Sequence, residues 1–206
     1  KVAKVLLNSQ DGTSLLNATI FGGAKSRLSS LVFPYYTGIM YIYTNPIKEA
    51  NKVVDFDVRY MRFGIRESLY RIWAASFATE LCIKMSSCIE WNLMNAFLDG
   101  ISISSDEECK IAILRFIWRV ALSSGLVPSF ENCANCKKQL NGVVYFDHTL
   151  GEFFCENCCE NKISSTPLSK EACDYLYKIA YKTPKEARLT ALSSEAFTLL
   201  TTFLHR

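Results

Sequence analysis

Histidine is scarce in this sequence, and several patterns that mark common enzyme classes are missing. Only two histidines occur, at positions 148 and 205, so a Cys–His catalytic pair is hard to assemble. Neither G-x-x-x-x-G-K-[ST] nor G-x-G-x-x-G is present, which excludes a Walker-type phosphate loop and a dinucleotide-binding fingerprint. Acidic residues are scattered without a paired motif. These absences favour a binding protein over an enzyme.

Long apolar runs are also absent. No stretch approaches the roughly 18 apolar residues of a membrane-spanning helix, so no membrane association is expected. The first residues, KVAKVLLNSQDG, carry polar side chains where a signal peptide needs an apolar core, so no signal peptide is expected. The net charge is only +3, so an acidic partner would have to bind to a local patch of basic residues. Half of the residues are hydrophobic, which is enough to build a core.

Cysteine, in contrast, is abundant. The chain has nine cysteines, an odd number, and four of them are scattered through apolar, helix-like sequence. Together with the missing signal peptide, this indicates a reducing cytosol and a cytoplasmic protein. The other five crowd into one short segment: Cys133, Cys136, Cys155, Cys158 and Cys159.

Residues 1–58 are predicted to be β-rich. VAKVLL, LLNATIF and GIMYIYT are short, rich in β-branched and aromatic residues, and separated by turn signals such as Asp11-Gly12. IMYIY is apolar on both faces, which favours a strand inside a small barrel or sandwich over an amphipathic hairpin at the surface.

Residues 59–206 are predicted to be mainly helical. In 65–85, apolar residues at three- and four-residue spacing, such as Leu69, Trp73 and Phe77, mark one face of a helix. In 105–128, Ser105 with Glu108 forms a capping box that opens a second helix, and Gly125 is its expected C-cap.

The remaining segments complete an α+β fold. GVVYFDHTLGEFFC, at 142–155, has the pattern of a hairpin with DHTLG as its turn. Thr166-Pro167 is expected to open a further helix, and Ser193 or Ser194 to cap the last one. We therefore predict an OB-like β-barrel domain at 1–58 and an α-helical domain at 59–206, which carries a metal-binding module at about 131–160.

The clustered cysteines have the spacing C-x2-C-x18-C-x2-C. Two Cys-x-x-Cys turns supply four thiolates for a tetrahedron, and a loop of about twenty residues between them is typical of zinc ribbons. Four thiolates leave no open coordination position, so one structural Zn²⁺ per chain is the favoured hypothesis. A redox centre, an iron–sulfur cluster and a metal-free cluster remain alternatives. Cys159 is interpreted as a bystander, and His148 as an exposed residue at the hairpin tip.

A glycine-containing basic loop, FGGAKSRLSS, follows a predicted strand at 21–30. Its cations, Lys25 and Arg27, are either solvated side chains of an exposed turn or phosphate contacts on a nucleic-acid-binding barrel. Residues 1–60 hold seven basic and four acidic residues, which gives 7 − 4 = +3, the net charge of the whole chain. Four tyrosines nearby offer faces on which unpaired bases can stack: Tyr35, Tyr36, Tyr41 and Tyr43.

Two stretches resemble the RecO family of bacterial recombination mediators. FGGAKSRLSSLVFPYYTGIMYIYTNP followed by VVDFDV is similar to its N-terminal domain, and RFIWRVALSSGLVPSFENCANC to its helical domain. The junction of Gly125, Pro128, Cys133 and Cys136 is the most specific part of this resemblance. The family's N-terminal domain is an OB fold of five strands, for which 58 residues are short.

The resemblance implies a non-enzymatic, nucleoid-associated DNA-repair protein. Relatives bind single- and double-stranded DNA, anneal complementary strands, associate with RecR and help to load the recombinase RecA. Lys25 and Arg27 are the predicted phosphate contacts. Arg115 and Arg119, four apart on one helical face, are either exposed surface residues or a site for the acidic tail of the single-strand-binding protein.

Overall fold

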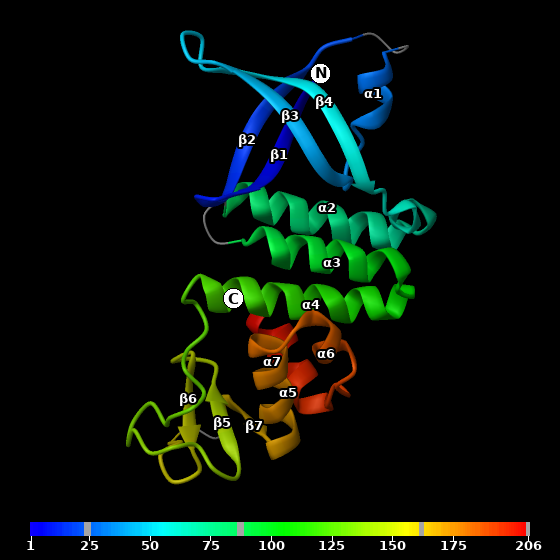
Figure 1. Ribbon diagram of the computed structural model, residues 1–206. Coiled ribbons are helices and arrows are strands. Elements are labelled where there is room, and N and C mark those ends of the chain that lie inside the picture. Colours follow the sequence, from blue (N-terminus) through cyan, green and yellow to red (C-terminus); the bar gives the residue numbers. More distant parts are fainter. Residues whose placement is uncertain (23–25, 86–88, 161–162, 205–206) are drawn as a thin grey trace. The chain divides into compact units, whose positions relative to one another are not determined.

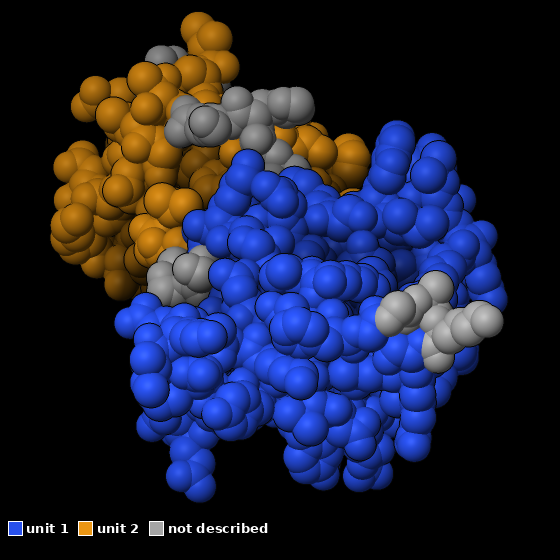
Figure 2. Space-filling view, turned by 90° about the horizontal axis from the view of Figure 1, so that it is seen from above, with its two compact units in different colours: residues 1–112 blue, residues 113–206 orange. Residues whose placement is uncertain are grey.

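The computed structural model describes residues 1–22, 26–85, 89–160 and 163–204. These residues form two compact units, Lys1–Ala112 and Ile113–Arg206, which Figure 2 colours separately. The structure combines β-sheets and helices in one chain, as expected for an α+β protein (Figure 1). The unit boundary reflects compactness, whereas the predicted boundary at 58/59 marks a change in secondary structure, so the domain assignment stays a prediction.

The first unit begins with a four-stranded sheet. Its strands are β1 (Val2–Ser9), β2 (Gly12–Ile20), β3 (Thr37–Asn45) and β4 (Ala50–Tyr60), in the order β1-β2-β4-β3. β1 and β2 form a hairpin through the predicted Asp11-Gly12 turn, where Gly12 has a φ of +102°. β2 pairs with β4 in parallel, and the short helix α1 (Arg27–Leu31) lies between β2 and β3 in the chain.

The predicted closed barrel is not found in the described residues. β1 and β3 are the edges of the sheet, and they are separated by a cavity of about 750 Å³ that residues of both strands line together with α2 and α3. Only four strands are available here, fewer than the five of an OB fold. The sheet is therefore open.

The prediction that IMYIY is buried on both faces is wrong. Along β3 the side chains alternate, with Met40 and Ile42 half-buried while Ile39, Tyr41 and Tyr43 are each more than half exposed. The reason is position, because β3 is an edge strand with only its inner face on the core. That core contains Ala18, Ile20, Val32, Val53 and Phe56.

Two helices and a 3-10 turn follow the sheet in the first unit, which ends within α4 (Asp106–Ser123). They are η1 (Phe63–Glu67), α2 (Leu69–Lys84) and α3 (Trp91–Ile103). The helix predicted at 65–85 is present, but the face that carries Leu69, Trp73 and Phe77 is exposed. Its buried face consists instead of Ala74, Ala75, Ala78 and Cys82. Small side chains allow close approach of neighbouring elements, so α2 packs on α3 and η1 through its alanines.

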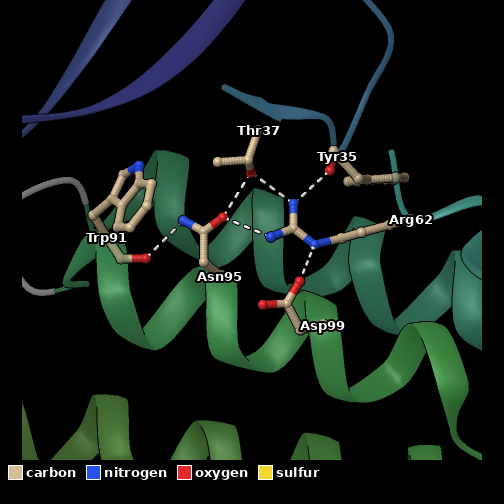
Figure 3. A network of polar contacts seen from close by, with 6 residues as sticks. All are labelled: Tyr35, Thr37, Arg62, Trp91, Asn95 and Asp99. Carbon is tan, nitrogen blue, oxygen red and sulfur yellow. Dashed lines mark hydrogen bonds and ion pairs between the residues drawn. The ribbon is translucent and has the colours of Figure 1, made fainter. Parts of the chain in front are cut away.

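A network centred on Arg62 ties the sheet to α3 (Figure 3). Arg62 Nη1 donates to the carbonyl of Tyr35 at 2.7 Å and to Thr37 Oγ1 at 2.6 Å. Its Nη2 donates to Asn95 Oδ1 at 2.7 Å, and its Nε to Asp99 Oδ1 at 2.6 Å. The Arg62 side chain is 4% exposed, so its charge is compensated almost entirely by protein groups.

Helix α4 (Asp106–Ser123) begins with the predicted capping box. The Glu108 amide donates to Ser105 Oγ at 3.3 Å, and the Ser105 amide donates to Glu108 Oε2 at 2.8 Å. Its C-terminus is closed by Gly125 with a φ of +70°, as expected. Leu114, Trp118 and Ala121 on the predicted stripe are buried.

The second unit holds a three-stranded sheet and three further helices. The sheet has the order β6-β5-β7, formed by β5 (Val144–Asp147), β6 (Glu152–Cys155) and β7 (Ser165–Leu168). The helices are α5 (Lys170–Tyr181), α6 (Pro184–Arg188) and α7 (Ser194–Leu204). They share a core with the C-terminal part of α4 that includes Trp118, Phe146, Phe153, Tyr175 and Leu199.

The predicted helix start at Thr166-Pro167 is wrong. Both residues lie in β7, an edge strand, where the missing N–H of Pro167 is tolerated. The helix begins three residues later, because Ser169 Oγ accepts a hydrogen bond from the Ala172 amide and so caps α5. The last helix is capped in the same way by Ser193.

Candidate metal centre and nucleic-acid interface

The β5–β6 hairpin brings the two Cys-x-x-Cys pairs together. Cys133 and Cys136 precede β5, whereas Cys155 ends β6 and Cys158 follows it. The Sγ atoms of all four cysteines lie within 4.8 Å of one another. Residues separated by up to 25 positions in the chain thus form one compact group of thiols, which is able to bind a metal ion.

Backbone hydrogen bonds shape each pair into a tight turn. The Lys137 amide donates to the Cys133 carbonyl at 3.0 Å, and Lys137 adopts a left-handed φ of 59°. In the second pair, the Cys158 amide donates to the Cys155 carbonyl at 3.0 Å. A tight turn of this kind lets both sulfurs of a pair face the same point.

The sulfur positions fit a tetrahedral ion. A tetrahedron with metal–sulfur bonds of about 2.3 Å has sulfur–sulfur edges of about 3.8 Å. The Cys136 and Cys155 Sγ atoms are 3.9 Å apart, close to that edge length. The Cys155 amide also donates to Cys133 Sγ at 3.4 Å, an interaction that favours a thiolate.

The thiols influence one another's protonation. Burial raises the pKa of the Cys133 thiol, but hydrogen bonds from the backbone of Cys155, Cys136 and Asn135 outweigh burial and lower that pKa to about 6. Hydrogen bonding to Cys155 and burial raise the pKa of the Cys158 thiol to about 12. Thiols so close together cannot all ionise without a cation between them.

Neither Cys159 nor His148 belongs to the thiol group. Cys159 is buried, and its Sγ lies 3.4 Å from Ser165 Oγ. His148 was predicted to be exposed, but it is half-buried because Nε2 lies 2.7 Å from Thr166 Oγ1 and the ring packs on Phe146. All cysteines of the described part are free thiols, and neither pair starts a helix as a redox centre requires.

The predicted phosphate contacts lie at the end of β2. Lys25 lies outside the described residues. Arg27 is the first residue of α1 and is exposed, and within the described part of the chain its guanidinium makes no ion pair. The other basic residues described in 1–60 are exposed as well: Lys1, Lys4, Lys48, Lys52 and Arg59.

The four tyrosines divide into two groups. Tyr35 and Tyr36 are half-buried at the turn before β3, where the Tyr35 hydroxyl lies 3.0 Å from Ser76 Oγ. Tyr41 and Tyr43 are exposed on β3. The sequence interpretation missed Phe21, which is exposed and has Lys52 Nζ 5.1 Å from its ring centre. Its position directly after the predicted strand was the feature of the sequence that could have identified it as exposed.

Arg115 and Arg119 both make hydrogen bonds within the second unit. Arg115 Nε donates to the Tyr175 hydroxyl at 2.9 Å. Arg119 donates to the carbonyls of Ile179 and Lys182, at the C-terminal end of α5. Burial lowers the pKa of the Arg119 guanidinium, which nevertheless stays charged.

Comparisons with known proteins agree with this architecture. Residues 66–206 match the family described as "Recombination protein O C terminal". The chain is also similar to the protein named "DNA repair protein RecO" of Pelotomaculum thermopropionicum, with 31% identity over 96 residues. That match covers 46% of this chain and 38% of the relative's length. None of the helices in the described ranges has the length and apolarity needed to cross a bilayer.

Proposed function

The chain belongs to the RecO family of DNA repair proteins, and on that premise we propose that it binds DNA and mediates recombination without catalysing a reaction. The observation that carries this proposal is the family match over residues 66–206, about two thirds of the chain. In this role the protein anneals complementary strands and helps to load RecA, together with RecR, in the cytoplasm at the nucleoid. Such work needs phosphate neutralisation and a partner surface, and no bond is made or broken.

DNA binding is assigned to the first unit, with Lys25 and Arg27 as phosphate contacts. Its support is electrostatic, since residues 1–60 carry a formal charge of +3 and their described cations are exposed. Exposed cations at a surface attract polyanions, and condensed counterions are released when DNA binds to them.

Replacing Lys25 and Arg27 together by alanine is expected to weaken DNA binding and slow annealing. Loss of two phosphate contacts should lower the slope of log affinity against log salt by about 1.4 for single strands. Fluorescence anisotropy over a salt series and annealing of a complementary oligonucleotide pair measure both effects.

The matched control replaces Lys84 and Lys110, two exposed cations that already pair with Glu80 and Glu107. This variant should bind DNA as the unmodified protein does. Equal salt slopes for the two double variants would show that Lys25 and Arg27 do not contact phosphate.

We further propose that Cys133, Cys136, Cys155 and Cys158 hold one structural Zn²⁺. Four thiolate donors within 4.8 Å of one another suit Zn²⁺, which when bound would act only as a cross-link because no coordination position stays open. The sulfur separation of 3.9 Å supports this choice.

Arg115 and Arg119 are proposed to receive the acidic tail of the single-strand-binding protein. Arg115 is the better test, because Arg119 already caps α5 and its loss would also disturb the fold. Arg115→Ala should lower affinity for the tail peptide about tenfold, the value of a charged hydrogen bond, while DNA affinity is kept. Tyr175→Phe is the control, since it removes the same internal hydrogen bond but keeps the arginine. Tail binding that is unaffected by Arg115→Ala removes this assignment.

A non-enzymatic zinc-ribbon adaptor that binds only proteins is the alternative function. The exposed apolar row Leu69, Trp73 and Phe77 on α2 favours it, because contiguous apolar surface is typical of protein interfaces. An adaptor would show no salt-dependent mobility shift with oligonucleotides, whereas a mediator would.

A further inference from the structure

We propose that Phe21, Tyr43 and Lys52 form a subsite that stacks unpaired bases of single-stranded DNA on the outer face of the first sheet. The inference rests on the proposed DNA-binding function and deepens it. It names the form of DNA that this surface recognises and assigns residues outside the basic loop.

The strand register places these three side chains on one face. Tyr43 of β3 and Thr19 of β2 both pair with Lys52 of β4, one on each side. Paired residues point to the same face of a sheet, with Cβ atoms about 5 Å apart. Phe21 follows Thr19 by two residues and shares its direction, and Lys52 Nζ lies 5.1 Å from the Phe21 ring centre.

The two rings have no packing role in the unit. Phe21 is 59% exposed and Tyr43 is 57% exposed, while the neighbouring Ile20 and Val53 fill the core on the opposite face. Exposing two aromatic rings on one face, with Lys52 between them, has a solvation cost that no packing in the described unit offsets. Large aromatic faces next to a cation are suited to a ligand that is flat and anionic.

Lys52 is the cation nearest to the two rings, since Tyr43 pairs with it on one side and Thr19 on the other. Lys4 pairs with Asn17, four residues before Phe21, so its ammonium group lies on the same face but about 13 Å along the strand from that ring. Asp55 pairs with Tyr41 on the Phe21 side of Lys52, and Asp57 is paired with Arg59 at 2.7 Å. A nucleotide stacked on Phe21 or Tyr43 therefore meets Lys52 for its phosphate, and Lys4 is available to a phosphate farther along the DNA strand.

Stacking restricts the subsite to unpaired bases. In a duplex the faces of each base are covered by its neighbours in the stack, so a protein ring on a sheet cannot reach them. In a single strand every base has an accessible face, and stacking on an aromatic side chain contributes independently of sequence.

The test compares variants of the complete protein with fluorescein-labelled oligo(dT) and with a blunt duplex of mixed sequence. Phe21→Ala and Tyr43→Ala are each expected to lower oligo(dT) affinity about tenfold and to leave duplex affinity unchanged. Tyr43→Phe should retain wild-type affinity, because the ring and not the hydroxyl makes the contact.

The control is Tyr60→Ala, which removes an equally exposed tyrosine, 62% exposed, from the opposite end of β4. If the wild-type protein binds oligo(dT) and both Phe21→Ala and Tyr43→Ala bind it equally well, the subsite is overturned and the proposed function stays intact. If the two variants lose as much affinity for the duplex as for oligo(dT), the stacking mechanism is overturned. Absence of any DNA binding by the wild-type protein would instead defeat the proposed function, and the subsite with it.

Discussion

Cys133→Ser should reduce the metal content from one ion per chain to none and unfold the two cysteine turns at 133–136 and 155–158. The β5–β6 hairpin between them should stay in place, because Val144, Phe146 and Phe153 belong to the main core of the second unit. The turns have only Cys133, Phe154 and Cys159 buried in their own cluster, which is too little apolar area to hold them. Structural zinc contributes on the order of 10 kcal/mol to the folding of small zinc modules. Elemental analysis and thermal unfolding with and without a chelator measure the two effects.

Cys159→Ser is the matched control for this prediction. Cys159 adjoins the second pair and is buried, but its thiol lies outside the group of four. The Cys159→Ser variant should keep one metal ion per chain, and its free energy of unfolding should fall only by the small contribution of a buried thiol. A wild-type protein that is purified without metal, and whose unfolding a chelator does not change, would contradict the zinc assignment.

Arg62→Ala should lower the free energy of unfolding of the first unit by about 3 kcal/mol. The side chain is 4% exposed and supplies hydrogen bonds to Tyr35, Thr37, Asn95 and Asp99 (Figure 3). Its removal leaves the Tyr35 carbonyl, Thr37 Oγ1 and Asn95 Oδ1 without this donor in a partly buried site, whereas the 57% exposed Asp99 side chain can turn to water. Urea unfolding monitored by tryptophan fluorescence and circular dichroism gives the change.

Two further variants test whether the loss of stability in Arg62→Ala comes from the hydrogen-bond network or from the loss of a positive charge. Arg66→Ala removes an exposed arginine four residues away, whose contacts are the rings of Phe33 and Tyr36, and should cost less than about 1 kcal/mol. Arg62→Lys keeps the charge but cannot reproduce the planar fork, so we expect a loss close to that of alanine. Equal stability of Arg62→Ala and Arg66→Ala would show that the network does not hold the unit together.

Elements whose signals are local were predicted well from the sequence. The Asp11-Gly12 hairpin, the capping box of Ser105 and Glu108, and the DHTLG turn each depend on residues within a few positions of one another. The same holds for the cysteine quartet, because the spacing of each pair fixes its turn and the hairpin between them joins the pairs.

Features set by tertiary packing were missed. The spacing of apolar residues located α2 correctly, but it predicted Trp73 and Phe77 on the buried face. Such spacing does not reveal that the alanines of the helix contact its neighbour. Helix α3 was missed although Met94, Phe97, Leu98 and Ile101 have helical spacing. Pro167 was placed in a helix because its edge position beside β5 depends on a pairing with Tyr145, twenty-two residues earlier.

The polar network and the stacking subsite are beyond any local pattern. Arg62 adopts a left-handed φ of 42° and contacts α3 more than thirty residues later. Phe21 meets Lys52 only because β2 and β4 run in parallel. Contacts of this kind need the register of strands that are distant in the chain, which composition and periodicity do not contain.

The order β6-β5-β7 has a consequence for how this protein can evolve. The central strand, β5, pairs on one side with β6, which ends in Cys155. On the other side it pairs with β7, which leads directly into α5. A lineage that lost the four thiols could substitute apolar side chains for the ion and keep the hairpin. A lineage that deleted the hairpin would leave β7, which leads into α5, without the backbone hydrogen bonds of β5. The four cysteines are therefore replaceable, whereas the hairpin between them is not.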